Sequence, residues 1–295
     1  MKIVLSGIFY PMAILRYFEA ALGRRDDIEL FTVGPFTGTW IPWANGMHLP
    51  IKYAKQPDLV LPKMQNYVPI GFVESKLPWQ PDLWLQIDAG FHFHGKPAKG
   101  KNVIVGTDPH VLNYDQQRTF ADTFYCMQTP YQKDGDSYLP YAYDPIWHAP
   151  EEQPQKNDVC LIGLHYDQRN KLVDRLRANG LSVYYDLGPC FDEARALYNQ
   201  APIGLNWSSL EDLTARVFEL LGMKRLAVVN RVPDLDLFFD DENDLLIFDT
   251  LDDAVDIVVW HNENRLRAEQ IAEQGHEAVK PHTWDARIET ILNEL

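Results

Sequence analysis

A glycine and an arginine in the second half of the chain stand at a spacing that suits the binding of a phosphorylated ligand. Gly163 ends the apolar run 159–162, and Arg169 follows it at the start of a predicted helix. A glycine at such a turn lets the backbone approach a ligand, and a guanidinium beside a helix N-terminus attracts a diphosphate. A tight turn and a surface arginine would give the same pattern, so the spacing leaves both interpretations open.

Further polar residues follow the apolar segment that ends at Trp207. A small polar loop comes next, and a helix is predicted to begin near Asp212. Ser209 precedes Asp212 at the spacing of a capping box, which is the structural role that we favour for Asp212. The loop amides and Thr214 are expected near the N-terminus of that helix, so this loop is a second candidate for ligand contact.

Arg216 and Glu219 share one face of the same predicted helix, because residues three apart are neighbours on a helix surface. An exposed ion pair of this kind contributes less than about 1 kcal/mol to stability. Val217, Leu220 and Leu221 supply the buried side of the helix. We therefore expect Arg216 and Glu219 to face a cleft or solvent.

The first half offers weaker candidates for chemistry. Gly7 ends the opening apolar run, and Asp108 and His110 follow a later one, where they could act on an acceptor substrate. His92 and His94 alternate in a way that could suggest a metal. No third ligand has a convincing spacing, so we predict no metal site.

Alternating strand and helix patterns position these residues in two similar halves. The first half has predicted strands at 2–7, 28–34, 83–87, 102–106, 124–127 and 138–140, and a helix at 12–22. Residues 35–80, rich in Pro, Trp and Gly, are predicted to form loops with at most short helices. The second half has predicted strands at 158–163, 181–185, 203–207, 226–230 and 245–248, and helices at 169–179, 191–199, 212–221, from 251, at 263–274 and at 284–295.

This alternation predicts an α/β fold of two doubly wound, Rossmann-like domains that face a central cleft. A proline-punctuated, polar segment at 144–154 is the best candidate for the linker. We place the N-terminal, acceptor-side domain at 1–150 and the C-terminal domain at 151–275. A helical segment at 276–295 could cross back to the first domain.

Composition narrows the classes of function. A length of 295 residues suits two domains, and a net charge of -15 disfavours a broad grip on nucleic-acid phosphates. Three widely spaced cysteines give neither a disulfide framework nor a metal pattern. No apolar window is long enough to span a bilayer and no leader segment is recognisable, so we expect a cytoplasmic protein. The absence of GxGxxG and Walker sequences disfavours a Rossmann dehydrogenase and a P-loop enzyme.

Several segments together resemble the CgeB-like, or spore-maturation-type, branch of the GT-B glycosyltransferases. The likeness is good from about residue 138 to the end of the chain, and thinner before it. The segments that carry it are the Leu-Pro-x-x-x-Asp run within 138–145, the glycine turn 161–163 with its following arginine, Arg-x-Phe-Glu at 216–219, and 271–287 with its His-Thr-Trp run; 107–110 is the main echo in the first half.

The resemblance implies a metal-independent glycosyltransferase of the GT-B fold that needs no cofactor and takes a nucleotide-sugar donor, most often a UDP-sugar. Glu219 would accept hydrogen bonds from the ribose hydroxyls, and Arg169, assisted by Arg216, would hold the diphosphate. Glu211 stands eight residues before Glu219, as in the two-glutamate motif of retaining enzymes, so we expect retention of anomeric configuration. Lys224 stands where the family usually has glycine, so we expect the local turn to differ.

The complete set of predicted site residues follows from these arguments. The donor-binding residues are Gly163, Arg169, Asn206, Ser208, Ser209, Thr214, Arg216 and Glu219; the catalytic candidates are His110, Asp108 and Glu211; and Gly7 lies on the acceptor side.

Three alternatives remain open at this level. A sugar-nucleotide epimerase of the same architecture would need no acceptor. A catalytically silent GT-B-like protein would only bind a partner or regulate one. A DNA-modifying glycosyltransferase is disfavoured by the acidity of the chain. The acceptor could otherwise be a glycan, a protein or a small molecule.

Overall fold

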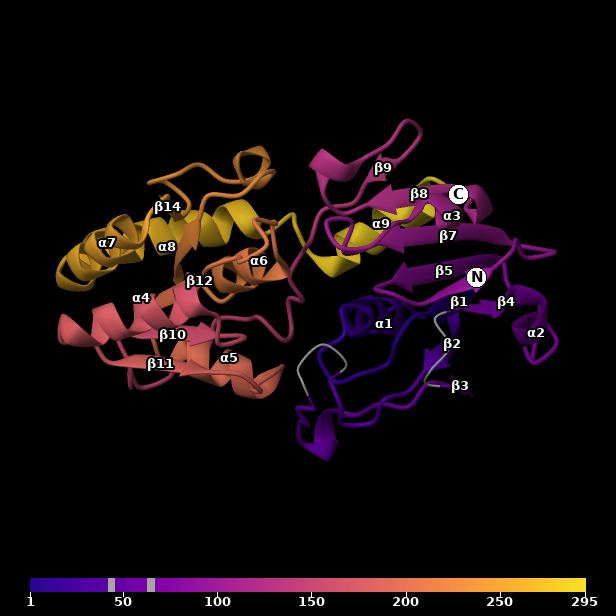
Figure 1. Ribbon diagram of the computed structural model, residues 1–295, viewed down its shortest axis with the longest axis horizontal. Coiled ribbons are helices and arrows are strands. Elements are labelled where there is room, and N and C mark those ends of the chain that lie inside the picture. The colour runs from indigo at the N-terminus through magenta and orange to yellow at the C-terminus, as the bar shows by residue number, and fades with distance from the viewer. Residues whose placement is uncertain (42–45, 63–66) are drawn as a thin grey trace. The chain divides into compact units, whose positions relative to one another are not determined.

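A computed structural model describes residues 1–41, 46–62 and 67–295 (Figure 1). The chain divides into two compact units. Unit 1 comprises Met1–Pro140 and Arg287–Leu295, and unit 2 comprises Tyr141–Ala286. The predicted linker segment 144–154 lies within unit 2, and two of its polar residues, Asp144 and His148, are buried.

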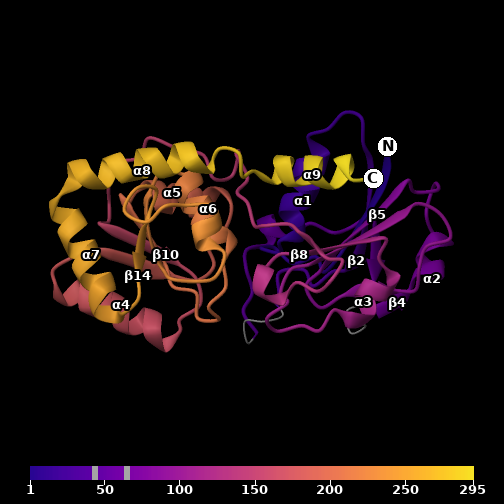
Figure 2. The ribbon, with the colours of Figure 1, turned by 90° about the horizontal axis from the view of Figure 1, so that it is seen from above.

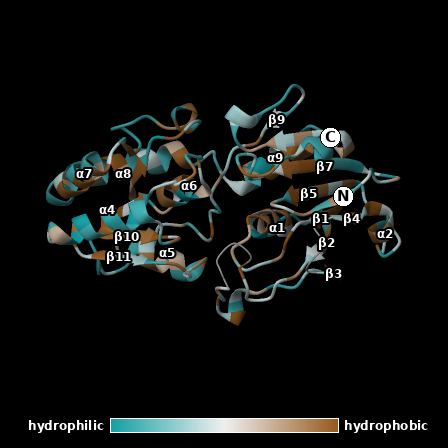
Figure 3. Ribbon diagram, in the orientation of Figure 1, coloured by the Kyte–Doolittle hydropathy of each residue, from teal (hydrophilic) through white to brown (hydrophobic). Residues whose placement is uncertain are grey.

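Unit 1 is built on a seven-stranded parallel sheet with the order β3-β2-β1-β5-β7-β8-β9. Every residue of β5 is buried, as expected for a strand that is covered on both faces. Figure 3 shows hydrophobic residues concentrated along β5 and β7. The strands are β1 (Lys2–Ser6), β2 (Glu29–Pro35), β3 (Leu59–Leu61), β5 (Leu83–Asp88), β7 (Lys101–Gly106), β8 (Thr123–Cys126) and β9 (Ser137–Tyr138).

Shorter elements complete unit 1. They are α1 (Leu15–Gly23), η1 (Ile51–Tyr53), α2 (Ile70–Glu74), α3 (Asp115–Phe120), η2 (Thr129–Tyr131) and the parallel pair β4 (Tyr67–Pro69) and β6 (His92–His94). The prediction of loops for residues 35–80 is wrong for β3 and β4, because strands of three residues are too short to show an alternating pattern. Residues 42–45 and 63–66 of that stretch lie outside the described residues.

Unit 2 is built on a five-stranded parallel sheet with the order β11-β10-β12-β13-β14. Its strands are β10 (Val159–Ile162), β11 (Val183–Asp186), β12 (Ile203–Asn206), β13 (Leu226–Asn230) and β14 (Leu246–Phe248). Its helical elements are α4 (Asp167–Ala178), α5 (Asp192–Asn199), α6 (Ala215–Gly222), η3 (Leu235–Leu237), α7 (Leu251–Glu263) and α8 (Arg265–Val279); α9 (Trp284–Asn293) begins in unit 2 and belongs to unit 1 from Arg287.

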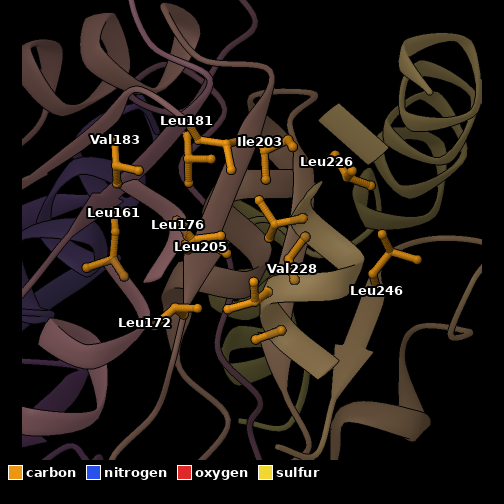
Figure 4. Close-up of a cluster of buried hydrophobic side chains, with 14 of the residues drawn as sticks. Leu161, Leu172, Leu176, Leu181, Val183, Ile203, Leu205, Leu226, Val228 and Leu246 are labelled. Atoms are coloured by element: carbon orange, nitrogen blue, oxygen red, sulfur yellow. The ribbon is translucent and has the colours of Figure 1, made fainter. Parts of the chain in front are cut away.

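Helices cover both faces of the unit 2 sheet. Figure 2 shows the strands between α4 on one face and α5 and α8 on the other. One cluster of buried aliphatic side chains joins α4 to the sheet (Figure 4). Leu172 and Leu176 from α4 meet Leu161, Leu205 and Val228 from three neighbouring strands. Burial of such side chains contributes roughly 1.5–3 kcal/mol each, which fixes α4 on the sheet.

The order of strands reverses once in each sheet. The chain builds outward from β1 through β2 and then returns to β5 on the other side, and it does the same from β10 through β11 to β12. Doubly wound sheets bind ligands beyond the carboxyl ends of the strands at such a reversal. The prediction of an α/β fold with parallel, doubly wound sheets is confirmed.

Candidate functional site

Arg169 occupies the strand reversal of unit 2. Its Nε and Nη2 donate to the carbonyl oxygen of Trp207, just after β12, at 2.9 and 2.7 Å. Its Nη1 donates to the carbonyl oxygen of Leu164, just after β10, at 3.2 Å. A Cβ atom on Gly163 would lie 2.4 Å from that Nη1. A side chain at position 163 would displace the guanidinium, so glycine leaves the room in which Arg169 bridges the two strand ends.

The guanidinium of Arg169 keeps its charge, and within the part of the chain that the structure describes it does not use all of its donors. Burial lowers its pKa below the ordinary value, yet an arginine remains protonated in proteins. The three bonds to Trp207 and Leu164 use part of the five N–H donors of an arginine. The rest are available to an anionic ligand at the carboxyl edge of the sheet.

Arg216 and Glu219 form an ion pair on α6, with 2.7 Å between Nη1 and Oε2. The other carboxylate oxygen, Oε1, lies 3.6 Å from Nε2 of His148. Glu219 is only 4% exposed, so of the two settings expected for it, a cleft or solvent, burial excludes open solvent. The burial of Glu219 comes from the segment around His148, which covers this face of α6.

His148 is a buried histidine whose tautomer is set by its hydrogen bond. Its Nδ1 accepts a hydrogen bond from the backbone N–H of Asp144 at 3.0 Å, so the proton of the neutral ring is on Nε2, facing Glu219. Burial lowers the pKa of His148, and Arg216 and Arg195 lower it further, while Glu219 and Asp144 raise it. Sequence reasoning missed His148, although it stands four residues after the acid of the Leu-Pro-x-x-x-Asp run.

Tyr198 of α5 connects the ion pair to the sheet. Its hydroxyl accepts a hydrogen bond from the backbone N–H of Ile162 at 3.0 Å, and the guanidinium carbon of Arg216 lies 5.1 Å from its ring centre. Burial raises the pKa of the phenol, so Tyr198 is neutral. No motif marks this residue, because a tyrosine on a helix usually indicates ordinary packing.

The polar loop after β12 is held by side chains of its own. The N–H of Ser208 donates to Oδ1 of Asn230 at 2.6 Å, and Nδ2 of Asn230 donates back to the Ser208 carbonyl at 3.2 Å. The Ser208 hydroxyl bonds to the Asp212 carboxylate. The prediction of a capping box between Ser209 and Asp212 is wrong, because Ser208 engages Asp212 and α6 begins three residues later, at Ala215.

Two other predicted residues of this loop differ in their settings. Asn206 is buried and donates from Nδ2 to Oγ1 of Thr214 at 3.2 Å, which joins the end of β12 to the residue that precedes α6. Glu211 is exposed and has a φ of 55°. Left-handed backbone at a non-glycine residue costs about 1–3 kcal/mol and occurs often at functional sites. Ser209 is partly buried between them.

Lys224 adopts the backbone conformation that glycine favours. Its φ is 57°, in the left-handed region. The lysine side chain pairs with Glu273. Lys224 thus forms a turn of the kind that a glycine would form, although it carries a side chain.

Gly7 lies at the carboxyl end of β1, next to the strand reversal of unit 1. A Cβ atom there would lie 2.7 Å from the carbonyl oxygen of Ile87 in β5. Asp88, the last residue of β5, is fully buried and accepts hydrogen bonds from the N–H of Gly90 and from Nε2 of Gln117, at 2.8 and 2.9 Å. Sequence reasoning missed Asp88. Its position directly after an apolar run is the signal that could have found it.

Asp108 and His110 follow β7 at the carboxyl edge of the same sheet. The Asp108 carboxylate accepts a hydrogen bond from the Thr107 hydroxyl, and its N–H donates to the Tyr114 hydroxyl at 3.2 Å. The ring of His110 lies 6.3 Å from that of Tyr131. Both candidates are partly exposed at this edge of unit 1.

His92 and His94 occupy alternate positions of β6, as predicted. Nδ1 of His92 lies 3.5 Å from Oδ2 of Asp88 and 3.1 Å from Nε2 of Gln117. His94 packs edge-on against Phe120. Within residues 1–41, 46–62 and 67–295, no group of three or more His, Cys, Asp or Glu residues is placed to hold a metal ion.

A pocket of about 450 Å³ lies at the opposite edge of unit 2, near the amino ends of β12 and β13. Pro202, Arg225 and Arg265 are among the residues that line it. Ligands of doubly wound sheets bind at the carboxyl ends of the strands, so we assign the site to the edge with Arg169 and Glu219. No helix of the described chain combines the length and the apolar character needed to cross a membrane.

Comparison with known families and proteins shows what the second half of the chain and the fold are similar to. Residues 158–293, which span most of unit 2, match the model of a family described as glycosyl transferase-like. No curated protein sequence gives a significant match to the chain.

Solved structures match the fold over the whole length of the chain. HepE from Anabaena, solved with UDP-glucose, has a TM-score of 0.68 at 10% identity, with 100% of each chain covered. Sucrose-phosphate synthase from Thermosynechococcus elongatus has a TM-score of 0.64 at 11% identity, covering 100% of this chain and 98% of its own. An α-glucosyltransferase solved with UDP-glucose and DNA containing an abasic site has a TM-score of 0.64 at 9% identity, covering 100% and 99%.

The chain therefore has the α/β fold with parallel sheets found in GT-B glycosyltransferases, as the sequence predicted. Its second half is similar to the glycosyl transferase-like family. Membership of the CgeB-like branch stays a prediction.

Proposed function

We propose that this protein is a glycosyltransferase that transfers a sugar from a UDP-sugar bound to unit 2 to an acceptor. The observation that carries the proposal is the arrangement of Arg169, Arg216 and the buried Glu219 at the carboxyl edge of the unit 2 sheet. These residues lie within the segment that is similar to the glycosyl transferase-like family.

Each member of this group has a chemical role in the proposal. Glu219, held by Arg216 through one oxygen, accepts hydrogen bonds from the ribose hydroxyls of the donor. Arg169 directs its remaining N–H donors to the diphosphate. Two guanidinium groups stabilise the charge that develops on the leaving nucleoside diphosphate, which is why the reaction needs no metal in this proposal. The UDP-glucose in two of the matched structures supports a uridine nucleotide.

The remaining predicted residues complete the proposed site. Gly163, Asn206, Ser208, Ser209 and Thr214 shape the donor-binding loops. Glu211 contacts the transferred sugar, and we propose retention of its configuration. Asp108 and His110 act on the acceptor side, as does Gly7. We also propose that the enzyme is CgeB-like and cytoplasmic, with a glycan, protein, small molecule or modified DNA as acceptor.

A panel of nucleotide sugars tests the donor class. UDP-, GDP- and dTDP-sugars are added to the protein, and binding is followed by thermal shift and then by titration calorimetry. We expect UDP-sugars to bind, with no change when EDTA is present. Arg169→Ala and Glu219→Ala should weaken binding, whereas Arg175→Ala is a matched control because Arg175 lies exposed on the same helix and pairs with Asp252. Unchanged affinity in both site variants would remove the assignment.

The reaction is identified by its products. Mass spectrometry of incubations with candidate acceptors should show addition of one sugar residue, and NMR of the product gives the anomeric configuration. Conversion of a UDP-sugar to an isomer without any acceptor would instead identify an epimerase. Binding of nucleotides with neither conversion nor transfer would indicate a binding protein of the same fold.

A further inference from the structure

The strongest feature that the proposed function leaves unused is the histidine beside the candidate ribose-binding carboxylate. His148 is 2% exposed and Glu219 is 4% exposed, so this contact is shielded from water. Nε2 of His148 lies 3.6 Å from Oε1 of Glu219, while Arg216 binds Oε2 at 2.7 Å. The two oxygens of the carboxylate therefore face different partners.

The hydrogen bonding of the His148 ring fixes which of its two nitrogens carries the proton. The backbone N–H of Asp144 donates to Nδ1, which requires Nδ1 to be unprotonated and leaves the proton on Nε2. The Asp144 carboxylate in turn accepts hydrogen bonds from the N–H groups of Ile146 and Trp147, at 2.9 and 3.0 Å. The turn that carries His148 is thus fixed by its own backbone, independently of Glu219.

A distance of 3.6 Å is longer than a hydrogen bond, so the imidazole acts on the carboxylate through an oriented N–H dipole. In a buried setting such a dipole biases the orientation of a charged group, because little water is present to screen it. Loss of this N–H would remove one of the groups that orient the Glu219 carboxylate.

We propose that His148 is a positioning residue for nucleoside recognition: its Nε2–H holds the Glu219 carboxylate in the orientation that receives the ribose hydroxyls of the donor. This inference rests on the proposed function, because it assigns the orientation of a group whose ligand is the donor nucleotide. His148 itself touches no substrate in this role.

Two isosteric variants separate the two nitrogens of the ring. In His148→Asn the amide occupies the place of Nδ1, so the bond from Asp144 can persist while the donor toward Glu219 is lost. In His148→Gln the terminal amide reaches the place of Nε2, so the donor persists while the acceptor for Asp144 is lost. A purely structural role of His148 would make binding follow the stability of each variant.

The test measures the Kd of UDP and of 2′-deoxy-UDP by titration calorimetry, together with the Tm of each unliganded protein. We expect His148→Asn to weaken UDP binding about tenfold, in the range seen when a residue that orients a ligand group is removed. We expect His148→Gln to stay within about threefold of the parent, because a single neutral donor is retained. The preference for UDP over 2′-deoxy-UDP should fall in His148→Asn and persist in His148→Gln.

The outcomes are distinct. If the parent protein binds UDP and both variants bind it as tightly as the parent, or both lose affinity in proportion to their Tm, the positioning role is overturned and the proposed function stands. If the parent protein does not bind UDP, the proposed function itself is overturned. A selective loss of ribose discrimination in His148→Asn supports the inference.

Discussion

Replacing Gly163 by alanine should displace the guanidinium of Arg169 while the arginine itself is kept. A Cβ atom at position 163 would lie 2.4, 3.4 and 3.8 Å from Nη1, Cζ and Nη2 of Arg169, which are its three nearest neighbours. No backbone barrier opposes alanine here, because Gly163 does not have a positive φ. The methyl group therefore acts on the guanidinium alone.

The size of the effect follows from the contacts that must change. The guanidinium has to retreat by about 1 Å to reach ordinary van der Waals separation from the new methyl group. Its hydrogen bonds to Trp207 and Leu164 then lengthen, and each bond from a charged donor contributes about 1.5–3 kcal/mol. Water can replace part of this, so we expect a stability loss of about 1–2 kcal/mol. An equal loss of diphosphate binding corresponds to a roughly tenfold higher Kd for UDP.

Titration calorimetry with UDP measures the change in Kd, and urea unfolding measures the stability. Gly23→Ala is the matched control, since among the described residues nothing outside its own helix turn and its chain neighbours lies within 4 Å of a Cβ at position 23, and its φ is not positive. We expect the control to bind UDP like the parent.

A double-mutant cycle tests whether Gly163→Ala acts through Arg169. In an Arg169→Ala background there is no guanidinium for the methyl group to displace, so Gly163→Ala should have no further effect on Kd. Equal effects of Gly163→Ala in both backgrounds would show that the glycine acts on something other than Arg169. An unchanged Kd in the parent background would show that the position of Arg169 does not matter for the nucleotide.

Three further predictions concern stability, each measured by urea unfolding. Gly275→Ala should lower the free energy of unfolding by about 3 kcal/mol, because its Cβ would lie 2.0 Å from the backbone carbonyl oxygen of Asp244, which cannot move aside easily. A loss of stability below the error of the measurement would contradict this packing. Tyr198→Phe should cost about 1–3 kcal/mol, because the buried N–H of Ile162 loses its acceptor; a neutral result would mean that water replaces the hydroxyl. Burial lowers the pKa of His148 below its ordinary 6.5, so as the pH falls the unfolded chain takes up the proton before the folded chain does. The stability of the fold therefore falls as the pH drops below about 6.5, by up to about 1.4 kcal/mol per pH unit. The difference in stability between the parent and His148→Asn should therefore change between pH 7.5 and 5.5, and a constant difference would refute the assignment.

The places of several candidate residues in the fold were predictable from the sequence. The sequence located Gly163, Arg169, Arg216 and Glu219 on the elements that carry them, because a glycine after an apolar run and a charged pair three apart are local patterns. It did not indicate that Glu219 is buried. The sequence pattern predicts a buried side of α6 that is formed by its apolar residues. Glu219 lies outside that side and is covered by the segment around His148, which is remote in sequence.

Composition and periodicity alone determined the alternation of strands and helices, the doubly wound α/β class and the ends of the strands where the charged residues lie. This is possible because the spacing of apolar residues is set by the geometry of each element. Only the tertiary structure decided that His148 faces Glu219, that Tyr198 links Ile162 to Arg216, and that Ser208 rather than Ser209 engages Asp212. The contacts of His148 and Tyr198 join residues from different elements, and Ser208 and Ser209 offer the same hydroxyl to Asp212. Their partners therefore depend on how the chain packs, which a local pattern of residues does not specify.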